Sequence, residues 1–234
     1  MEGKKIVAVF DWDNTVRNGY TIRDWLVHLL DIGHEVQPLI SVFDSYAQAY
    51  ADNEISHDDF AMKFCIDYCV FFKGWDESLL LEEVDSYIFK DKQSLFGFSA
   101  DLFRHFKQQN IPIIVLTGAP SLILNKYKKI FGIDAVLGFE HEVEAGKFTG
   151  RVESNFGYEK GKTMKVVRAI YMGKIVGFGD SESDLPIINN SDIAFVIGNE
   201  NLHHNKRMGS VFCINPDENF LKIKSLLAIK PSYP

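Results

Sequence analysis

The sequence predicts an α/β protein in which an open parallel β-sheet carries helices on both of its faces. Five short runs of mostly β-branched and aromatic residues lack the polar alternation of a half-exposed strand, which is typical of strands buried on both faces. Stretches with helical spacing lie between these runs, and strands that alternate with helices build parallel, doubly wound sheets. Residues 17–94 contain no such run, which indicates an all-helical insertion after the first strand.

The strands of this Rossmann-like sheet are expected at the five apolar runs, Ile6–Phe10, Ile111–Leu116, Ile175–Phe178, Ile193–Ile197 and Val211–Ile214. The helices of the sheet-forming part are expected at Ser99–Gln109, Ser121–Phe131, Lys162–Tyr171 and Leu185–Asn190. Gly132 stands where a left-handed glycine commonly ends a helix. Residues Phe139–Val152 alternate apolar and polar side chains around Ala145-Gly146, which predicts a β-hairpin.

The insertion differs from the rest of the chain in charge and in aromatic content. Residues 17–94 hold 6 Lys/Arg and 15 Asp/Glu, a net charge of −9, so with −7 for the whole chain the remainder carries +2. Thirteen of the 78 residues in the insertion are Phe, Trp or Tyr. We therefore expect two units, an α/β core of residues 1–16 and 95–234 and a helical unit of residues 17–94.

Length and composition exclude several classes of protein. The chain has 234 residues, which suits one globular domain with a modest insertion, and it has no apolar run long enough for a membrane span. Three cysteines argue against a disulfide framework, and the short apolar stretch near the N-terminus is not a signal peptide, so we expect a cytoplasmic protein. The negative net charge and the lack of a dense Lys/Arg cluster argue against a nucleic-acid partner. The oligomeric state is not predicted.

Polar and acidic side chains follow three of the expected strands. Asp11 and Asp13 come after the first run, Thr117-Gly118 after the second, and Asp180 and Asp184 after the third. The carboxyl ends of parallel strands meet at one edge of a sheet, where ligands bind. Four carboxylates gathered there would repel one another, and a hard divalent cation such as Mg²⁺ would relieve the repulsion. Taken singly, each aspartate also fits a turn or a helix cap.

These residues, in chain order, resemble the four motifs of the haloacid dehalogenase (HAD) superfamily: Asp11-Trp12-Asp13-Asn14-Thr15, Thr117-Gly118, Lys162, and Gly179-Asp180-Ser181-Glu182-Ser183-Asp184. The first and last motifs are specific, and the middle two are weak alone. The helical insertion directly after the first motif is similar to the cap of the phosphoserine-phosphatase-like branch. The hairpin is similar to the stretch that such enzymes carry before the lysine.

The resemblance implies a phosphatase, whose substrate would be a small-molecule phosphate ester. Asp11 would be the nucleophile that forms an aspartyl-phosphate, and Asp13 would be the general acid and base. Mg²⁺ would be held by Asp11, by the backbone carbonyl of Asp13, and by Asp180. Asp184 would support the metal site.

The same resemblance assigns the binding of the phosphoryl group to Thr117, Gly118 and Lys162. Lys160 is a rival for the lysine, and Lys162 is preferred because it fits a Gly-Lys helix start.

The sequence departs from phosphoserine phosphatases at positions that bear on the substrate. Tyr20 stands where these enzymes tend to carry a glutamate that binds the substrate amine, and Ala119 stands where they tend to have a second glycine. Phosphoserine is therefore not indicated, and Tyr20 becomes a candidate substrate-binding residue. The acidic, aromatic insertion favours an ester with a cationic or amino tail, if its carboxylates and rings both face the substrate.

Three alternatives remain open. A dehalogenase also uses a nucleophilic aspartate but does not need the second acid, so Asp13 favours phosphate chemistry. A signalling receiver domain combines similar residues, but it is about half as long and carries its acceptor on a middle strand. A catalytically silent binding protein on this fold would lack motif residues, and all of them are present.

Overall fold

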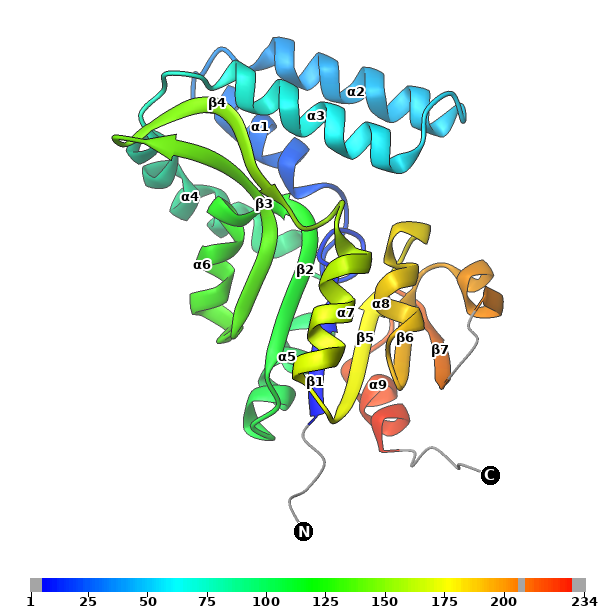
Figure 1. Cartoon of the computed structure of the whole chain (residues 1–234). Helices are drawn as coiled ribbons and strands as arrows, with labels where there is room; N and C mark the ends of the chain where they lie inside the picture. The colour runs from blue at the N-terminus through cyan, green and yellow to red at the C-terminus, as the bar shows by residue number, and fades with distance from the viewer. Residues whose placement is uncertain (1–5, 206–208, 229–234) are drawn as a thin grey trace.

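The computed structural model describes residues 6–205 and 209–228. A seven-stranded sheet with the order β4-β3-β2-β1-β5-β6-β7 forms the centre of the molecule (Figure 1). All neighbouring strands are parallel except β3 and β4, which pair as an antiparallel hairpin. The strands are β1 (Ile6–Phe10), β2 (Ile113–Pro120), β3 (Ala135–Glu144), β4 (Lys147–Asn155), β5 (Lys174–Gly179), β6 (Ile193–Ile197) and β7 (Ser210–Ile214).

Each of the five apolar runs forms a strand of this sheet, as predicted. A sixth parallel strand was not predicted, because the first half of β3 offers only the short apolar stretch Ala135–Leu137, which pairs with β2. The second half of β3 pairs with β4 and forms the predicted hairpin. At its turn, Ala145 (φ 50°) and Gly146 (φ 76°) both adopt the left-handed conformation that a tight type I′ turn requires.

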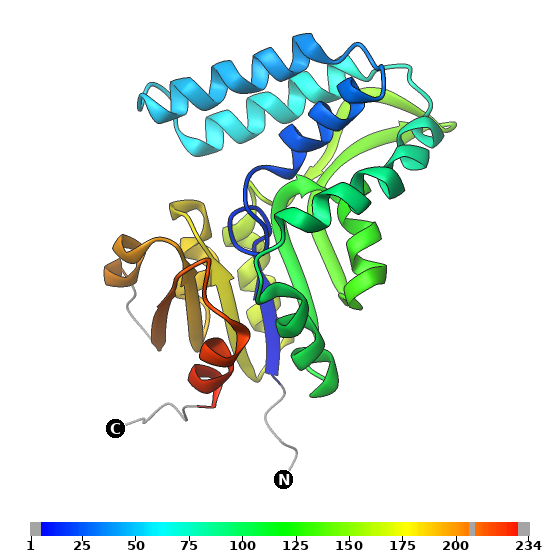
Figure 2. The same ribbon diagram turned by 180° about the vertical axis from the view of Figure 1, so that it is seen from behind.

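Helices cover both faces of the sheet. On one face Phe10 of β1 stacks on Phe178 of β5, with ring centroids 4.2 Å apart, and packs against Phe103 of α5. On the other face Val9 packs in a separate cluster with Met164 of α7. α7 lies in front of the sheet in Figure 1, and α5 and α9 lie in front in the reverse view of Figure 2. The α/β class predicted from the sequence is thereby confirmed.

The helices are α1 (Thr21–Asp31), α2 (Gln37–Ala51), α3 (His57–Phe71), α4 (Glu77–Asp91), α5 (Ser99–Gln108), α6 (Ser121–Phe131), α7 (Lys160–Ile170), α8 (Leu185–Asn189) and α9 (Phe220–Leu227). Short 3₁₀ turns lie at Lys92–Ser94, Glu182–Asp184 and Glu200–Asn205. α7 begins two residues before its predicted start, which matters for the site described below. Within the described part of the chain, none of the helices combines the length and hydropathy needed to cross a membrane.

Residues 17–94 contain helices α1 to α4 and no strand of the sheet, in agreement with an all-helical insertion. The β3–β4 hairpin extends from the sheet to this insertion (Figure 1). The backbone N–H of Gly74 donates to the carbonyl of Phe148 at 2.8 Å, and the N–H of Phe148 donates to the carbonyl of Trp75 at 3.0 Å. The hairpin therefore joins the sheet to the α3–α4 connection and helps to fix where the insertion lies.

Candidate active site

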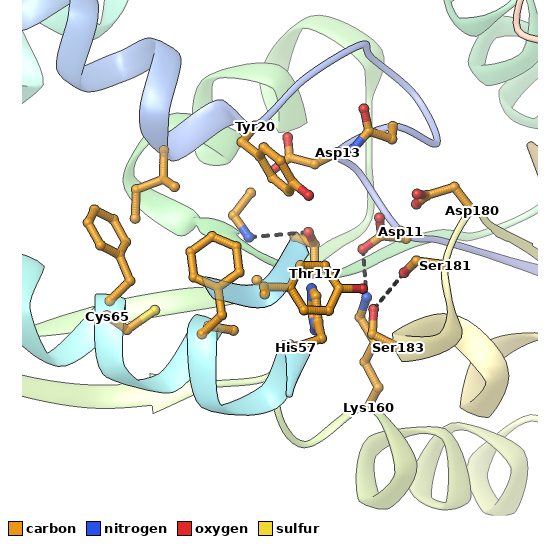
Figure 3. Close-up of a pocket in the computed structure, with 18 of the residues that line it drawn as sticks. Asp11, Asp13, Tyr20, His57, Cys65, Thr117, Lys160, Asp180, Ser181 and Ser183 are labelled. Atoms are coloured by element: carbon orange, nitrogen blue, oxygen red, sulfur yellow. Dashed lines mark hydrogen bonds and ion pairs between the residues drawn. The ribbon is translucent and has the colours of Figure 1, made fainter. Parts of the chain in front are cut away.

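The predicted site residues other than Lys162 gather where β1 lies between β2 and β5. From β1 the chain continues to β2 and β3 on one side of the sheet and later returns to build β5, β6 and β7 on the other side. This change of direction opens a crevice at the carboxyl ends of the strands, the usual ligand site of such sheets. Asp11 follows β1, Thr117 lies in β2 and Asp180 follows β5 (Figure 3).

A buried lysine bridges two of the aspartates. The Nζ atom of Lys160 lies 2.7 Å from Asp11 Oδ1 and 2.6 Å from Asp184 Oδ1, and all three side chains are at most 8% exposed (Figure 3 shows the contact with Asp11). Burial alone would lower the pKa of Lys160, but the two carboxylates outweigh it and raise the pKa, so the ammonium stays charged. The first residue of α7 thus carries a fixed positive charge into the crevice.

Lys162 does not lie in this cluster. The sequence analysis preferred Lys162 to Lys160, and this was wrong, because Lys160 is the lysine that reaches the crevice. Its side chain is 79% exposed, and its Nζ pairs with Glu159 at 2.6 Å. Because α7 begins at Lys160, the Gly-Lys pair used for the prediction lies inside the first turn. Two residues further along a helix, a side chain points about 200° around the axis, away from the first.

Asp184 is held in place by the loop that precedes it. Its Oδ2 accepts hydrogen bonds from the backbone N–H groups of Asp180 at 3.0 Å and Ser181 at 3.1 Å. Burial would raise the pKa of Asp184, but Lys160 and these N–H groups hold it below its ordinary value. A Cβ on Gly179 would lie 2.4 Å from the Cβ of Asp184, so the close approach requires glycine there.

Asp11, Asp180 and Asp184 form a potential metal-binding cluster. One carboxylate oxygen from each lies within 4.8 Å of the others. Burial, followed by repulsion from Asp184, raises the pKa of Asp11 to about 7, and burial with repulsion from Asp184 and Asp11 raises the pKa of Asp180 to about 9. These shifts mean that the single charge of Lys160 does not balance the carboxylates. An all-oxygen donor set with uncompensated negative charge fits a hard divalent cation such as Mg²⁺.

Asp13 lies at the entrance to the insertion. Its Oδ1 accepts hydrogen bonds from the backbone N–H of Thr21 at 2.9 Å and from the Thr21 hydroxyl at 2.5 Å. The guanidinium of Arg17 lies 3.6 Å away. Burial raises the pKa of Asp13, although Arg17 and Thr21 oppose the shift. The first residue of α1 therefore fixes the orientation of this carboxylate.

Arg17 was not predicted from the sequence. Its side chain is fully buried, pairs with Asp24, and lies 2.9 Å from Asp91 at the end of α4. The hydroxyls of Tyr87 and Tyr127 also donate to Asp91, at 3.0 and 2.7 Å. This network ties together the two connections of the insertion to the sheet, right beside Asp13. The signal in the sequence was a charged residue two positions after the end of a specific motif.

Thr117, Gly118 and Ala119 form the β2 edge of the crevice. Thr117 is buried, and its Oγ1 accepts a hydrogen bond from the N–H of Ala119 at 3.2 Å. A Cβ on Gly157 would lie 2.4 Å from the Cα of Gly118. Gly157, a residue outside the motifs, thus allows the segment before α7 to pass directly over this edge.

A cavity of about 120 Å³ lies between the crevice and the insertion. Asp11, Asp13, Thr117, Lys160 and Asp180 line it from the sheet side. From the insertion it is lined by Tyr20, Ile22, Phe43, Tyr50, His57, Phe60, Ala61, Phe64 and Cys65. All of residues 17–94 are described, and none of the aspartates or glutamates of this segment lines the cavity. The expectation that its carboxylates face the substrate is therefore not met, whereas several of its aromatic rings do face the cavity.

The fold and the site define a Rossmann-like α/β protein with a carboxylate–lysine cluster in the crevice at its strand ends. The sequence model of the haloacid dehalogenase-like hydrolases matches residues 8–189, which is most of the chain. The protein belongs to this family, as its motifs predicted.

Several solved structures share the fold at low sequence identity. A Bordetella pertussis Tohama I protein of unknown function has a TM-score of 0.70 and 15% identity over 90% of this chain and 99% of its own. A phosphoserine phosphatase in a phospho-aspartyl intermediate analogue form has a TM-score of 0.66 and 17% identity over 97% and 100%. A phosphoserine phosphohydrolase-like protein from Francisella tularensis subsp. tularensis SCHU S4 has a TM-score of 0.63 and 14% identity over 94% and 99%. A search of curated proteins finds no match.

Proposed function

We propose that the protein is a Mg²⁺-dependent phosphomonoester hydrolase that acts on a small phosphorylated metabolite through an aspartyl-phosphate intermediate. The observation that carries the proposal is the buried Lys160 between Asp11 and Asp184, with Asp180 beside them, on the sheet side of the cavity. Transfer of a phosphoryl group depends mainly on positioning and on neutralisation of its charge, and this arrangement offers both. The shared fold with phosphoserine phosphatases supports the same reaction class.

In the proposed reaction, a carboxylate oxygen of Asp11 attacks the phosphorus atom and the bond between phosphorus and the ester oxygen breaks. Asp13 protonates the departing oxygen, and the pKa raised by its burial keeps a proton available for this step. Asp13 then takes a proton from a water molecule, whose oxygen attacks the phosphorus and releases phosphate from Asp11. Splitting the hydrolysis into two displacements replaces one difficult step with two easier ones.

Lys160, the Thr117 hydroxyl and the N–H of Gly118 would bind the phosphoryl oxygens. Asp11, Asp180 and the backbone carbonyl of Asp13 would hold Mg²⁺, which supplies charge neutralisation at the phosphoryl group when bound. Asp184 acts indirectly, because it fixes Lys160 and is itself held by the N–H groups of Asp180 and Ser181.

We further propose that residues 17–94 act as a cap over a core of residues 1–16 and 95–234. The cavity lies between these two parts, so the cap residues that line it would contact the part of the substrate that leaves with the ester oxygen. Tyr20 is one of them, and its ring packs edge-on against Phe43 and Phe60. Its position supports a role in substrate binding.

The test is phosphate release from p-nitrophenyl phosphate by the wild type, Asp11→Asn and a control, Asp101→Asn, which changes an exposed carboxylate on α5. We expect Asp11→Asn to lose essentially all turnover with its fold intact, and the control to retain wild-type rates. EDTA should abolish activity and Mg²⁺ should restore it. Wild-type-like turnover by Asp11→Asn would contradict the mechanism, and halide release from a 2-haloacid without phosphate release would favour a dehalogenase.

A second arm tests the acid. Asp13→Asn should slow turnover of an alkyl phosphate by about 10²–10⁴-fold, the usual contribution of general acid–base catalysis. The loss should be smaller for p-nitrophenyl phosphate, because nitrophenolate leaves without much help from a proton. Equal losses for both esters would exclude Asp13 as the acid that protonates the leaving group.

A further inference from the structure

The insertion contributes an apolar, mostly aromatic wall to the cavity. Phe43, Phe60 and Phe64 are at most 4% exposed and pack edge-to-face, with centroids 5.2 Å apart for Phe43 and Phe60 and 4.9 Å apart for Phe43 and Phe64. The ring of Tyr20 lies 5.7 Å from Phe43 in the same manner. These edge-to-face contacts hold the rings against one another.

Charge is confined to the opposite wall. Among the described residues that line the cavity, Lys160 is the one lysine or arginine, and two carboxylates already pair with it. The one titratable imidazole of the insertion that lines the cavity is His57, whose pKa is lowered by burial and then by Lys160, so it is neutral at pH 7. Figure 3 shows His57 and Tyr20 facing the cluster of Asp11, Lys160 and Asp180.

A charged tail that lies against the insertion would therefore leave water without gaining an opposite charge from this wall. A buried ammonium or carboxylate needs a counter-charge or several hydrogen bonds. The described cavity-lining residues of the insertion include no lysine, arginine, aspartate or glutamate, and their polar groups are the Tyr20 and Tyr50 hydroxyls, the His57 imidazole and the Cys65 thiol. An apolar tail gains from the same wall, by about fourfold in affinity for each methylene group removed from water. The cavity has a volume of about 120 Å³. For comparison, an apolar cavity of roughly 150 Å³ admits benzene.

We propose that this site takes the phosphate esters of small, uncharged, apolar alcohols or phenols, and that it discriminates against esters with a charged amino or carboxyl tail. The inference rests on the proposed phosphatase function and adds the substrate class to it. The anionic phosphoryl group would lie at Lys160 and Thr117, and the apolar alcohol would lie against Phe43, Phe60 and Tyr20.

Two pairs of nearly isosteric esters test the proposal. 2,3-Dimethylbutyl phosphate matches phosphoserine with a methyl group in place of the ammonium and an isopropyl group in place of the carboxylate. 3,3-Dimethylbutyl phosphate matches phosphocholine with a carbon in place of the charged nitrogen. We expect kcat/KM at fixed Mg²⁺ and salt to be about tenfold or more higher for the neutral member of each pair, because an unpaired buried charge costs at least this factor. The charged groups withdraw electrons and make better leaving groups, so intrinsic reactivity opposes the expected order.

The outcomes separate the two proposals. Hydrolysis of phosphoserine or phosphocholine as fast as that of its neutral isostere would overturn the substrate class and leave the phosphatase function standing. A faster reaction of phosphocholine in particular would mean that the rings bind a cation through their faces. Absence of phosphate release from every ester, p-nitrophenyl phosphate included, would overturn the phosphatase function and the substrate class with it.

A carboxylate placed in the wall should change the preference. Ala61 lines the cavity from α3, so Ala61→Glu should lower the ratio of kcat/KM for 3,3-dimethylbutyl phosphate to that for phosphocholine by about tenfold. Ala61→Gln adds the same bulk without the charge, and Ala100→Glu adds the same charge at an exposed position of α5 outside the cavity. Both should keep the wild-type ratio. An unchanged ratio in a folded Ala61→Glu would overturn the proposal, and the isosteric pairs remain decisive in the wild type if this variant does not fold.

Discussion

Replacing Lys160 with methionine would remove the one buried positive charge that lies between Asp11 and Asp184. The two Nζ–oxygen distances are 2.7 and 2.6 Å, and the side chains involved are between 0% and 8% exposed, so solvent screens the interaction little. Removing one partner of such a buried ion pair costs about 3–5 kcal/mol in the free energy of unfolding. We expect a loss of this size for Lys160→Met at pH 8 without divalent metal.

The loss of stability should shrink as the pH falls. In the wild type, the pKa of Asp184 is held below its ordinary value despite burial, because Lys160 stabilises the charged form. A lowered pKa contributes stability that is fully present above the unfolded-state pKa and is lost as pH falls through the folded-state pKa. Without Lys160, burial dominates, the carboxyls take up protons on folding, and the variant approaches the wild type at acidic pH.

The matched control is Lys162→Met, two residues further along α7. The Lys162 side chain is exposed and pairs only with Glu159, so this variant should match the wild type in stability and in turnover. Lys160→Met should in contrast lose about 10²–10³-fold in kcat with p-nitrophenyl phosphate, the usual cost of removing one preorganised charge-stabilising group.

Urea unfolding followed by circular dichroism, and initial rates at saturating Mg²⁺, measure the two effects. The reasoning fails if Lys160→Met keeps wild-type stability at pH 8, or if Lys162→Met is the variant that loses turnover. Lys160→Arg serves as a further check on geometry, because it keeps the charge but presents it as a planar group.

Two further predictions concern residues outside the motifs. A Cβ on Gly157 would meet the backbone of Gly118 at 2.4–2.5 Å, so Gly157→Ala should displace this edge of the crevice and lower kcat/KM by about 10²-fold. Gly161→Ala is the control, because the added methyl group has open space around it. This variant should keep its activity and gain about 0.5–1 kcal/mol in stability, since alanine is favoured over glycine within a helix. Equal activities of the two variants would refute the steric argument. Burial lowers the pKa of His141 to about 4 from 6.5, so its neutral form stabilises the fold above pH 6.5 and this contribution is lost as pH falls toward 4. Between pH 7.5 and 5 the wild type should lose about 2 kcal/mol more stability than His141→Phe, and parallel pH profiles in urea unfolding would contradict the assignment.

Local patterns in the sequence were sufficient to predict most of the architecture. Strands buried on both faces show as uninterrupted apolar runs, and the left-handed turn at Ala145-Gly146 shows in its own residues, because backbone sterics act over a few neighbouring positions. The acidic residues after β1 and β5 could be placed together for a related reason: parallel strands bring their carboxyl ends to one edge whatever lies between them. The helical insertion was evident from the lack of any strand-like run.

The identity of the buried lysine depended on tertiary packing. Lys160 and Lys162 are two residues apart in similar local sequence. Which of them faces the crevice depends on where α7 begins and on the ion pairs that Asp11 and Asp184 form there with an ammonium group. The same holds for Arg17, whose partners Asp24 and Asp91 lie far apart along the chain, and for the acidic residues of the insertion, which lie outside the cavity lining. A residue's type and neighbours along the chain establish what it can do chemically. The side chains that contact it in the folded structure either stabilise its buried charge or leave that charge uncompensated. These contacts establish whether the residue takes part in the chemistry.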